Sequence, residues 1–172
     1  MPTVTYSPIS TTLLTSNATT VVFSSIPQTY TDLKLVINGI ADGTGQDYYV
    51  RFNGDANSNY QRTYYLASDT TEYRSASTSA TTHLQLMYVV NGGQVGEPMF
   101  CEMDIFDYAT THSSKQMLVN SGSTRNEVGI IGPKWTSSSA ISSITIAGSN
   151  SFSLSDLVTG SRFTLYGILA GS

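Results

Sequence analysis

Apolar and polar residues alternate with a period of two in many short stretches of this chain, from about residue 19 to residue 168. In residues 32–38, Leu33, Leu35 and Ile37 share one side, while Lys34 and Val36 share the other. Such alternation buries one row of side chains and exposes the other, as in a half-buried strand. The pattern recurs in Tyr48, Val50 and Phe52; in Met99, Cys101, Met103 and Ile105; in Met117 with Val119; in Ile144 with Ile146; and in Phe163 with Leu165.

Helical signals are weak by comparison. The chain is rich in Thr, Val, Ile, Tyr and Ser and has no long run of Ala, Leu, Glu and Lys, so only residues 153–158 could form a single helical turn. Short polar turns separate the alternating stretches. We therefore predict an all-β fold, an antiparallel β-sandwich of about eight to ten strands that is jelly-roll-like in preference to a closed barrel.

The length of 172 residues fits a single domain. We assign residues 18–172 to the sandwich. Residues 1–17 are polar and alternate only weakly, so we predict an N-terminal arm that becomes ordered on a neighbouring subunit, or a first edge segment of the sheet. Residues 67–82 are rich in Ser and Thr and lack large aliphatic side chains, which predicts a long loop at one end of the sandwich.

Charged residues make up only 12% of the chain, against about 25% in an average soluble protein. Ser and Thr account for 48 of the 172 residues, so hydroxyl groups must cover much of the outside. A surface with few charges associates readily, because little charge has to be desolvated. This composition favours a subunit of an assembly. The alternative is a low-charge domain from an extracellular setting.

The net charge of −4 and the scattered basic residues argue against binding to a nucleic acid backbone, which requires clustered Lys and Arg. No segment is long and apolar enough to span a bilayer, so we expect no membrane partner. The first thirty residues contain no Lys or Arg and no sustained apolar run, unlike a secretory signal. We expect synthesis and assembly in a cytoplasm.

Catalytic motifs are missing from the sequence. There is no Gly-x-Ser-x-Gly motif, and His83 and His112 are the only histidines. Glu102 and Asp104 share one face of a predicted strand, with Asp107 nearby, a spacing that a glycosidase could use. The solvent face of a sheet normally carries such residues, however. We predict no catalytic residue and no enzymatic activity.

Metal and cofactor motifs are also weak. Cys101 lies within an apolar alternation, which is typical of a small core residue, and one Cys with two distant His cannot form a zinc site. Asp55-x-Asn57-x-Asn59 resembles the start of a calcium loop, but Tyr60 stands where that loop needs Gly. Phosphate-binding glycine motifs are absent. We therefore predict no metal and no cofactor.

Tyrosines and arginines cluster between residues 48 and 74. Both types contribute strongly to binding, because each combines a large contact area with a directional polar group. These side chains could pack against a neighbouring subunit, which we favour, or stack on sugar rings. The candidate binding residues are Tyr49, Arg51, Tyr60, Arg62, Tyr64, Tyr65, Tyr73 and Trp135.

Five blocks, distributed along the chain from residue 6 to residue 168, combine strand and turn residues. They are Tyr6-Ser7-Pro8-Ile9; Thr19-Thr20-Val21-Val22-Phe23-Ser24-Ser25-Ile26-Pro27; Tyr30-Thr31-Asp32-Leu33-Lys34-Leu35-Val36; Arg51-Phe52-Asn53-Gly54-Asp55 with Asn59-Tyr60; and Gly160-Ser161-Arg162-Phe163-Thr164-Leu165-Tyr166-Gly167-Ile168. Together these blocks resemble small virion proteins of tailed bacteriophages. The blocks contain no reactive residue.

The resemblance implies a β-sandwich subunit, often trimeric, of the capsid decoration (cement) type or the tail fibre type. Our leading hypothesis is a virion structural protein that decorates the capsid and binds the major capsid protein. A tail protein would be the partner if the chain belongs to the tail. The alternative hypothesis is a carbohydrate-binding adhesion module of a tail fibre or spike. Either way we expect a homo-oligomer located in the virion.

Overall fold

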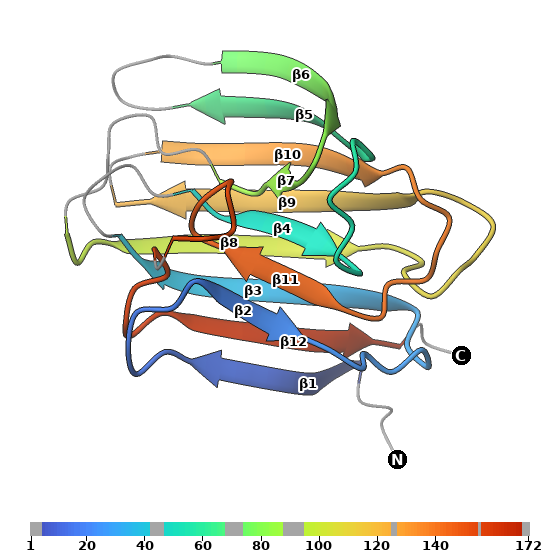
Figure 1. Ribbon diagram of the computed structural model, residues 1–172, viewed down its shortest axis with the longest axis horizontal. Coiled ribbons are helices and arrows are strands. Elements are labelled where there is room, and N and C mark those ends of the chain that lie inside the picture. Colours follow the sequence, from blue (N-terminus) through green and yellow to red (C-terminus); the bar gives the residue numbers. More distant parts are fainter. Residues whose placement is uncertain are drawn as a thin grey trace.

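The computed structural model describes residues 5–41, 47–67, 74–87, 95–124, 127–154 and 156–169. These residues form twelve β-strands and no helix, so none of them lies in a helix that could cross a membrane. The strands build two antiparallel sheets that lie face to face (Figure 1). The predicted antiparallel, jelly-roll-like β-sandwich is therefore confirmed.

The large sheet has eight strands in the order β1-β12-β3-β8-β9-β10-β5-β6, so the last strand lies between the first and the third. The two edges of this sheet are β1 and β6. The bounds are β1 (Tyr6–Leu13), β3 (Asp32–Ile40), β5 (Tyr60–Ala67), β6 (Arg74–Thr81), β8 (Pro98–Ile105), β9 (Lys115–Ser123), β10 (Glu127–Trp135) and β12 (Arg162–Ile168).

The small sheet has four strands in the order β2-β11-β4-β7 and covers the middle of the large sheet, in front of it in Figure 1. One face of the large sheet packs against the small sheet. The other face, which we call the outer face, is not covered by any described strand. The bounds are β2 (Thr20–Phe23), β4 (Tyr49–Phe52), β7 (Leu84–Gln85) and β11 (Ile144–Ala147).

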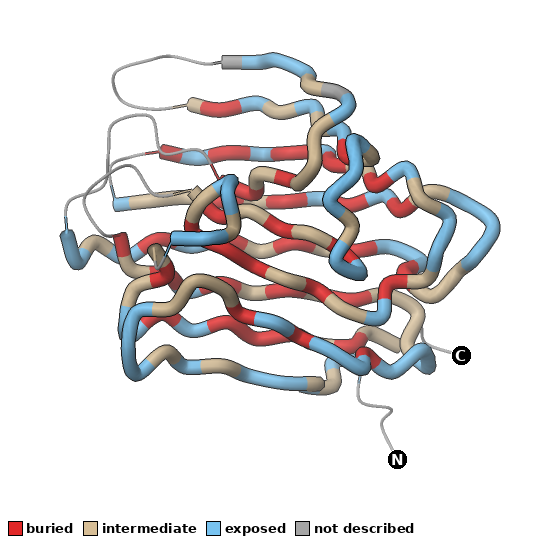
Figure 2. The backbone as a smooth tube through the Cα atoms, viewed as in Figure 1, coloured by how far each residue is buried: buried red, intermediate tan, exposed pale blue. Residues whose placement is uncertain are grey.

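The core lies between the two sheets and contains the rows that the alternation predicted. Buried and exposed residues alternate along most strands (Figure 2). In β3, Leu33, Leu35 and Ile37 are fully buried, whereas Lys34 and Val36 are only half-buried on the outer face. In β8, Met99, Cys101, Met103 and Ile105 are buried in the same way. Side-chain periodicity alone therefore located the core strands.

Residues 74–81 form strand β6, where the sequence had predicted part of a long loop. This strand pairs antiparallel with β5, with Thr63 opposite Ser77 and Tyr65 opposite Ser75. An edge strand needs no aliphatic row if its backbone is paired on one side, so small hydroxyl residues are sufficient here. The strand count is consequently higher than the eight to ten expected.

The N-terminal segment belongs to the sheet of its own subunit. Strand β1 pairs with β12, with Tyr6 opposite Ile168, and Ala18 exchanges both backbone hydrogen bonds with Leu157. The described part of this segment, residues 5–17, contains the edge strand β1, and the division into residues 1–17 and 18–172 stays a prediction. Residues 1–4 lie outside the described residues.

Candidate functional site

The turn between β4 and β5 is organised around the carboxylate of Asp55. Its Oδ1 accepts hydrogen bonds from the backbone N–H of Asn57 at 2.9 Å and from the Asn57 side chain at 2.8 Å. Its Oδ2 accepts from Asn59 Nδ2 and from Trp135 Nε1, both at 2.8 Å. Asp55, Asn57 and Asn59, which resemble the start of a calcium loop, thus form a hydrogen-bonded turn in which both asparagine side chains donate to the Asp55 carboxylate.

Asn53 fixes the same turn to the segment before β11. The Asn53 backbone is left-handed, with φ of 52°, and Gly54 follows with φ of 67°. The Asn53 side-chain oxygen accepts hydrogen bonds from the backbone N–H groups of Ser142 and Ser143, at 2.8 and 3.1 Å. The sequence block around Asn53, Gly54 and Asp55 therefore has a structural role in this fold.

Two of the predicted binding residues, Tyr60 and Trp135, lie in the core. They are 0% and 2% exposed and stack with ring centroids 6.4 Å apart. The Tyr60 hydroxyl donates to the Asp55 carbonyl, and burial raises the pKa of Tyr60 to about 12. The polar atoms of both side chains donate hydrogen bonds to Asp55, Tyr60 to its carbonyl and Trp135 to its carboxylate. This corrects the prediction that they contact a partner.

Tyr49 and Arg51 project from β4 on the outside of the small sheet. The Arg51 guanidinium lies 4.0 Å from the ring centroid of Phe152, and its Nε donates to the carbonyl of Thr82 at 3.0 Å. The Tyr49 ring meets the His83 ring edge-on, with centroids 5.0 Å apart. His83 in turn lies 6.3 Å from Phe152, so these four side chains form one contact group.

Arg62 and Tyr64 extend this group from β5 of the large sheet, which contacts β7. Arg62 donates to the carbonyl of Gln85 in β7 at 3.2 Å, and its guanidinium lies 5.0 Å from the Tyr64 ring centroid. We call the whole set the β7 cluster. It consists of Tyr49, Arg51, Arg62, Tyr64, His83, Gln85 and Phe152.

The β7 cluster combines four of the predicted binding residues with three that the sequence did not indicate as binding residues, His83, Gln85 and Phe152. Phe152 is separated from Arg51 by about a hundred positions and has a left-handed φ of 57°. Only its aromatic character in a polar turn could have marked it. A half-buried surface with two arginines and several rings can stack on, and hydrogen-bond to, a polar ligand.

Burial lowers the pKa of His83, and the positive charges of Arg51 and Arg62 lower it further. The folded protein therefore resists protonation of this ring, whereas the unfolded chain takes up the proton near pH 6.5. The neutral imidazole is the form that packs against Tyr49.

We expect the free energy of unfolding to decrease as the pH falls below 6.5, because the unfolded state then binds a proton that folded His83 excludes. His83→Gln should remove this part of the acid dependence. Urea unfolding of both proteins above and below pH 6.5 measures it. His112→Gln, in an exposed loop, is the control. An identical acid slope in wild type and His83→Gln would contradict this role for His83.

The remaining predicted residues lie elsewhere. Tyr65 is on the outer face of the large sheet and is 50% exposed. Tyr73 lies outside the described residues. The eight candidates thus do not form one site: four meet in the β7 cluster, two are in the core, and one belongs to the opposite side of the molecule.

The carboxylates of Glu102 and Asp104 share the outer face, as the alternation predicted. Lys34 on the adjacent strand lies 3.0 Å from an oxygen of each. Burial would lower the pKa of Lys34, but the two carboxylates outweigh this effect and raise it. An ion-paired group of this kind is a typical arrangement for the solvent face of a sheet.

Five of the exposed large apolar or aromatic side chains of the outer face lie on adjacent strands, and we call them the outer patch. They come from four adjacent strands, β5, β10, β9 and β8. Tyr6 and Leu13 of β1 are also exposed, at the edge of the same face. Val128 is 56% exposed, Ile130 51% and Phe100 42%. The outer patch consists of Tyr65, Phe100, Leu118, Val128 and Ile130.

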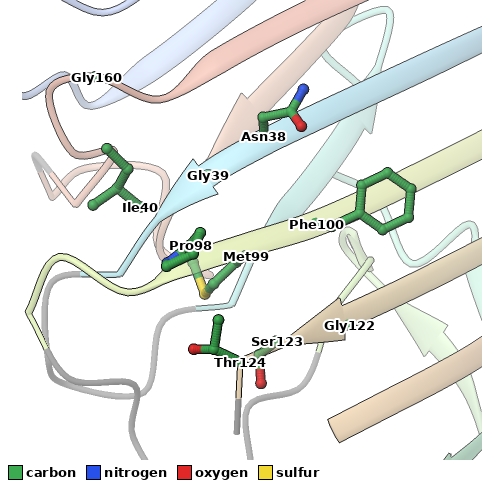
Figure 3. A pocket seen from close by; sticks show the side chains of 10 residues that line it. All are labelled: Asn38, Gly39, Ile40, Pro98, Met99, Phe100, Gly122, Ser123, Thr124 and Gly160. Carbon is green, nitrogen blue, oxygen red and sulfur yellow. The ribbon is translucent and has the colours of Figure 1, made fainter. Parts of the chain in front are cut away.

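A pocket of about 510 Å³ lies at one end of the outer face, where β3, β8 and β9 come together (Figure 3). Phe100 belongs both to this pocket and to the outer patch. The described residues that line the pocket include Asn38, Ile40, Pro98 and Gly122, and none of these described lining residues is titratable. The pocket can accommodate an apolar group.

Metal ligands do not gather in the part of the chain that the structure describes, where no three His, Cys, Asp or Glu side chains are placed to share an ion. Cys101 is fully buried, and burial raises the pKa of its thiol. A buried neutral thiol is unreactive.

No protein family model matches this sequence, and no curated protein matches it. A homodimeric agglutinin from chicken liver has a similar structure, with a TM-score of 0.34 and 13% identity over 84% of this chain and 98% of the agglutinin. The alginate lyase Aly36B, in complex with alginate tetrasaccharide, gives 0.30 and 8% over 83% and 72%. An alginate lyase from Aplysia kurodai gives 0.30 and 8% over 85% and 72%. Likenesses this distant support no functional argument.

Proposed function

We propose that this chain is a structural protein of a bacteriophage virion, a capsid decoration or cement protein that stabilises the shell by contacts with other protein chains. The observation that carries the proposal is the outer patch, an exposed apolar area in a chain with few charges. Monomeric proteins rarely expose such an area unless it binds something. The resemblance to small virion proteins of tailed bacteriophages supplies the biological setting.

The surroundings of the titratable groups support a role without catalysis. Lys34 is ion-paired with both Glu102 and Asp104, Asp55 accepts four hydrogen bonds, and His83 lies near Arg51. The proposed partners are a second copy of the chain and the major capsid protein, or a tail protein if the chain belongs to the tail. The net charge of −4 disfavours a nucleic acid partner.

The test is cryo-electron microscopy of the phage particle whose genome carries this sequence, combined with mass spectrometry of the purified virions. We expect peptides of this chain in the virion and density for the sandwich on the capsid surface. Density at the tail alone would refute the capsid assignment. Absence of the chain from purified particles would refute the virion proposal as a whole.

A second candidate function is a carbohydrate-binding adhesion module, and the β7 cluster is the observation that favours it. Arginine and aromatic side chains on one half-buried surface suit a sugar with polar or acidic groups. A glycan array with the native oligomer tests this function. Binding that Arg51→Ala abolishes would support it, and an array without any signal would remove it.

A further inference from the structure

We propose that a second copy of this chain packs face to face on the outer patch, related to the first by a twofold axis that runs along β9. This inference rests on the proposed function only in treating the outer patch as a protein-contact surface. It adds which face binds the second copy and how the two copies are oriented.

The outer patch extends over four adjacent strands. Strand register places Ile130 opposite both Tyr65 in β5 and Asn120 in β9. Phe100 in β8 and Val128 in β10 both lie opposite the same residue, Gly122. Since Gly122 has no side chain, a shallow gap separates Phe100 from Val128, and a protruding apolar side chain from another molecule can enter it.

The outer face is large enough for a stable dimer. Strands about 4.8 Å apart and roughly eight residues long give eight strands an area of about 1,000 Å². A standard interface buries about 800 Å² on each partner, with an apolar centre and a polar rim. The outer patch lies on β8, β9, β10 and β5 of this face. Lys34, Glu102 and Asp104 lie on its β3 side and Lys134 lies towards one end of β10, so charged groups border the patch on two sides.

The charges of the outer face favour a second copy over an acidic or a basic partner. The residues that the strand register places on this face include three basic and three acidic side chains, so the face is neutral although the chain carries −4. Two copies therefore repel each other least through this face. These side chains are Lys34, Lys134, Arg162, Asp32, Glu102 and Asp104.

A rotation by 180° about an axis parallel to β9 brings complementary groups together. Strand β8 of one copy then lies over β10 of the other, so Phe100 faces Val128 of the second copy, because both are level with Gly122. Asp104, opposite Leu118 in its own sheet, comes next to Lys134 of the second copy, whose position in the sheet is opposite Gln116. Glu102 comes opposite Ile130, but Lys34 draws its carboxylate towards β3. Leu118 meets its own copy near the axis.

Sedimentation equilibrium of the full chain with a matched pair of variants tests the contact. Val128 and Val22 are 56% and 53% exposed. Val128 lies on the outer face of the large sheet, whereas Val22 lies on the exposed side of the small sheet. We expect a wild-type dimer that Val128→Glu weakens at least about 30-fold, because the contact would bury an unpaired charge. Val22→Glu should leave the dimer unchanged. Thermal unfolding of both variants checks that each is folded.

Cysteine cross-linking tests the axis independently of any loss of folding. Cys101 is fully buried, so a cysteine introduced on the surface is the reactive one. Leu118→Cys should form a covalent dimer under mild oxidation, and Val22→Cys should not. Either a wild-type monomer at about 1 mM, a trimer, or a dimer that survives Val128→Glu would overturn the inference. The chain could still be present in virions, so failure here and failure of the proposed function are distinguishable.

Discussion

Asp55→Ala is expected to lower the free energy of unfolding by about 3 kcal/mol, because hydrogen bonds to a charged group contribute more than neutral ones and this carboxylate accepts four. The substitution leaves the N–H group of buried Trp135 without its acceptor. Chemical denaturation followed by tryptophan fluorescence measures the loss directly, since Trp135 is the single tryptophan.

The control for this prediction is Asp32→Ala, which removes a carboxylate that accepts one hydrogen bond, from the backbone of Asp107 at 2.8 Å. It should cost about 1 kcal/mol. Equal losses for the two variants would mean that the Asp55 network contributes little.

The stabilisation by Asp55 also depends on pH. Burial alone would raise the pKa of Asp55, but the hydrogen bonds from Asn59, Trp135 and Asn57 outweigh it and hold the pKa below 3.8. The carboxylate therefore contributes its full stabilisation above pH 3.8 and loses it as the pH falls through the lower pKa of the folded state. The difference between wild type and Asp55→Ala should shrink over that range.

Gly39→Ala is expected to cost about 3 kcal/mol, because a Cβ at this position would lie 1.8 Å from the Tyr48 hydroxyl and 2.6 Å from the ring carbon that carries it. Tyr48 is fully buried and packs edge-on against Phe163 at 6.0 Å, so the ring has no free space into which to move. Thermal and denaturant unfolding measure this loss.

Two further variants identify steric conflict as the cause. Gly132→Ala, in the same sheet, places its Cβ no closer than 3.9 Å to the Thr63 carbonyl and should be nearly neutral. Adding Tyr48→Phe to Gly39→Ala removes the closest atom and should recover part of the loss relative to Tyr48→Phe alone. A double mutant as unstable as the sum of the single ones would argue against a direct clash.

The sequence predicted the core strands because burial on one side of a strand leaves a period-two pattern, as in β3 and β8. It did not predict β6, whose small hydroxyl residues carry no apolar row, because an edge strand is specified by the neighbour with which it pairs. The order of the strands is likewise set by long-range pairing. No local pattern indicated that β12 lies between β1 and β3.

The candidate site was predicted only in part, and the reason is visible in β5. Tyr60, Arg62 and Tyr64 lie on one side of the strand, whereas Tyr65 lies on the other, five positions from Tyr60. These side chains were assigned to one site because they are close in sequence. Even- and odd-numbered positions of this strand face opposite sides of the sheet, however, so Tyr65 is separated from the others. Trp135 was assigned to a surface for its size and its polar atom, yet that atom bonds Asp55 inside the molecule.

Apart from Tyr65, the residues of the outer patch were not predicted to be exposed binding residues, for a related reason. Val128 and Ile130 alternate with Gly129 and Ile131, so both faces of this part of β10 are largely apolar. An apolar run of that kind resembles a strand buried on both sides. Only the position of the small sheet shows that one of those faces remains exposed.

The position of β12 between β1 and β3 has a consequence for biogenesis. During synthesis on the ribosome, β1 emerges long before β12, the strand with which it pairs, with Tyr6 opposite Ile168. Its backbone has no partner in the sheet until β12 has been synthesised. A ribosome that stops before residue 162 releases a chain in which β1 has lost its neighbour and an edge of β3 is open, and such unpaired edges invite aggregation.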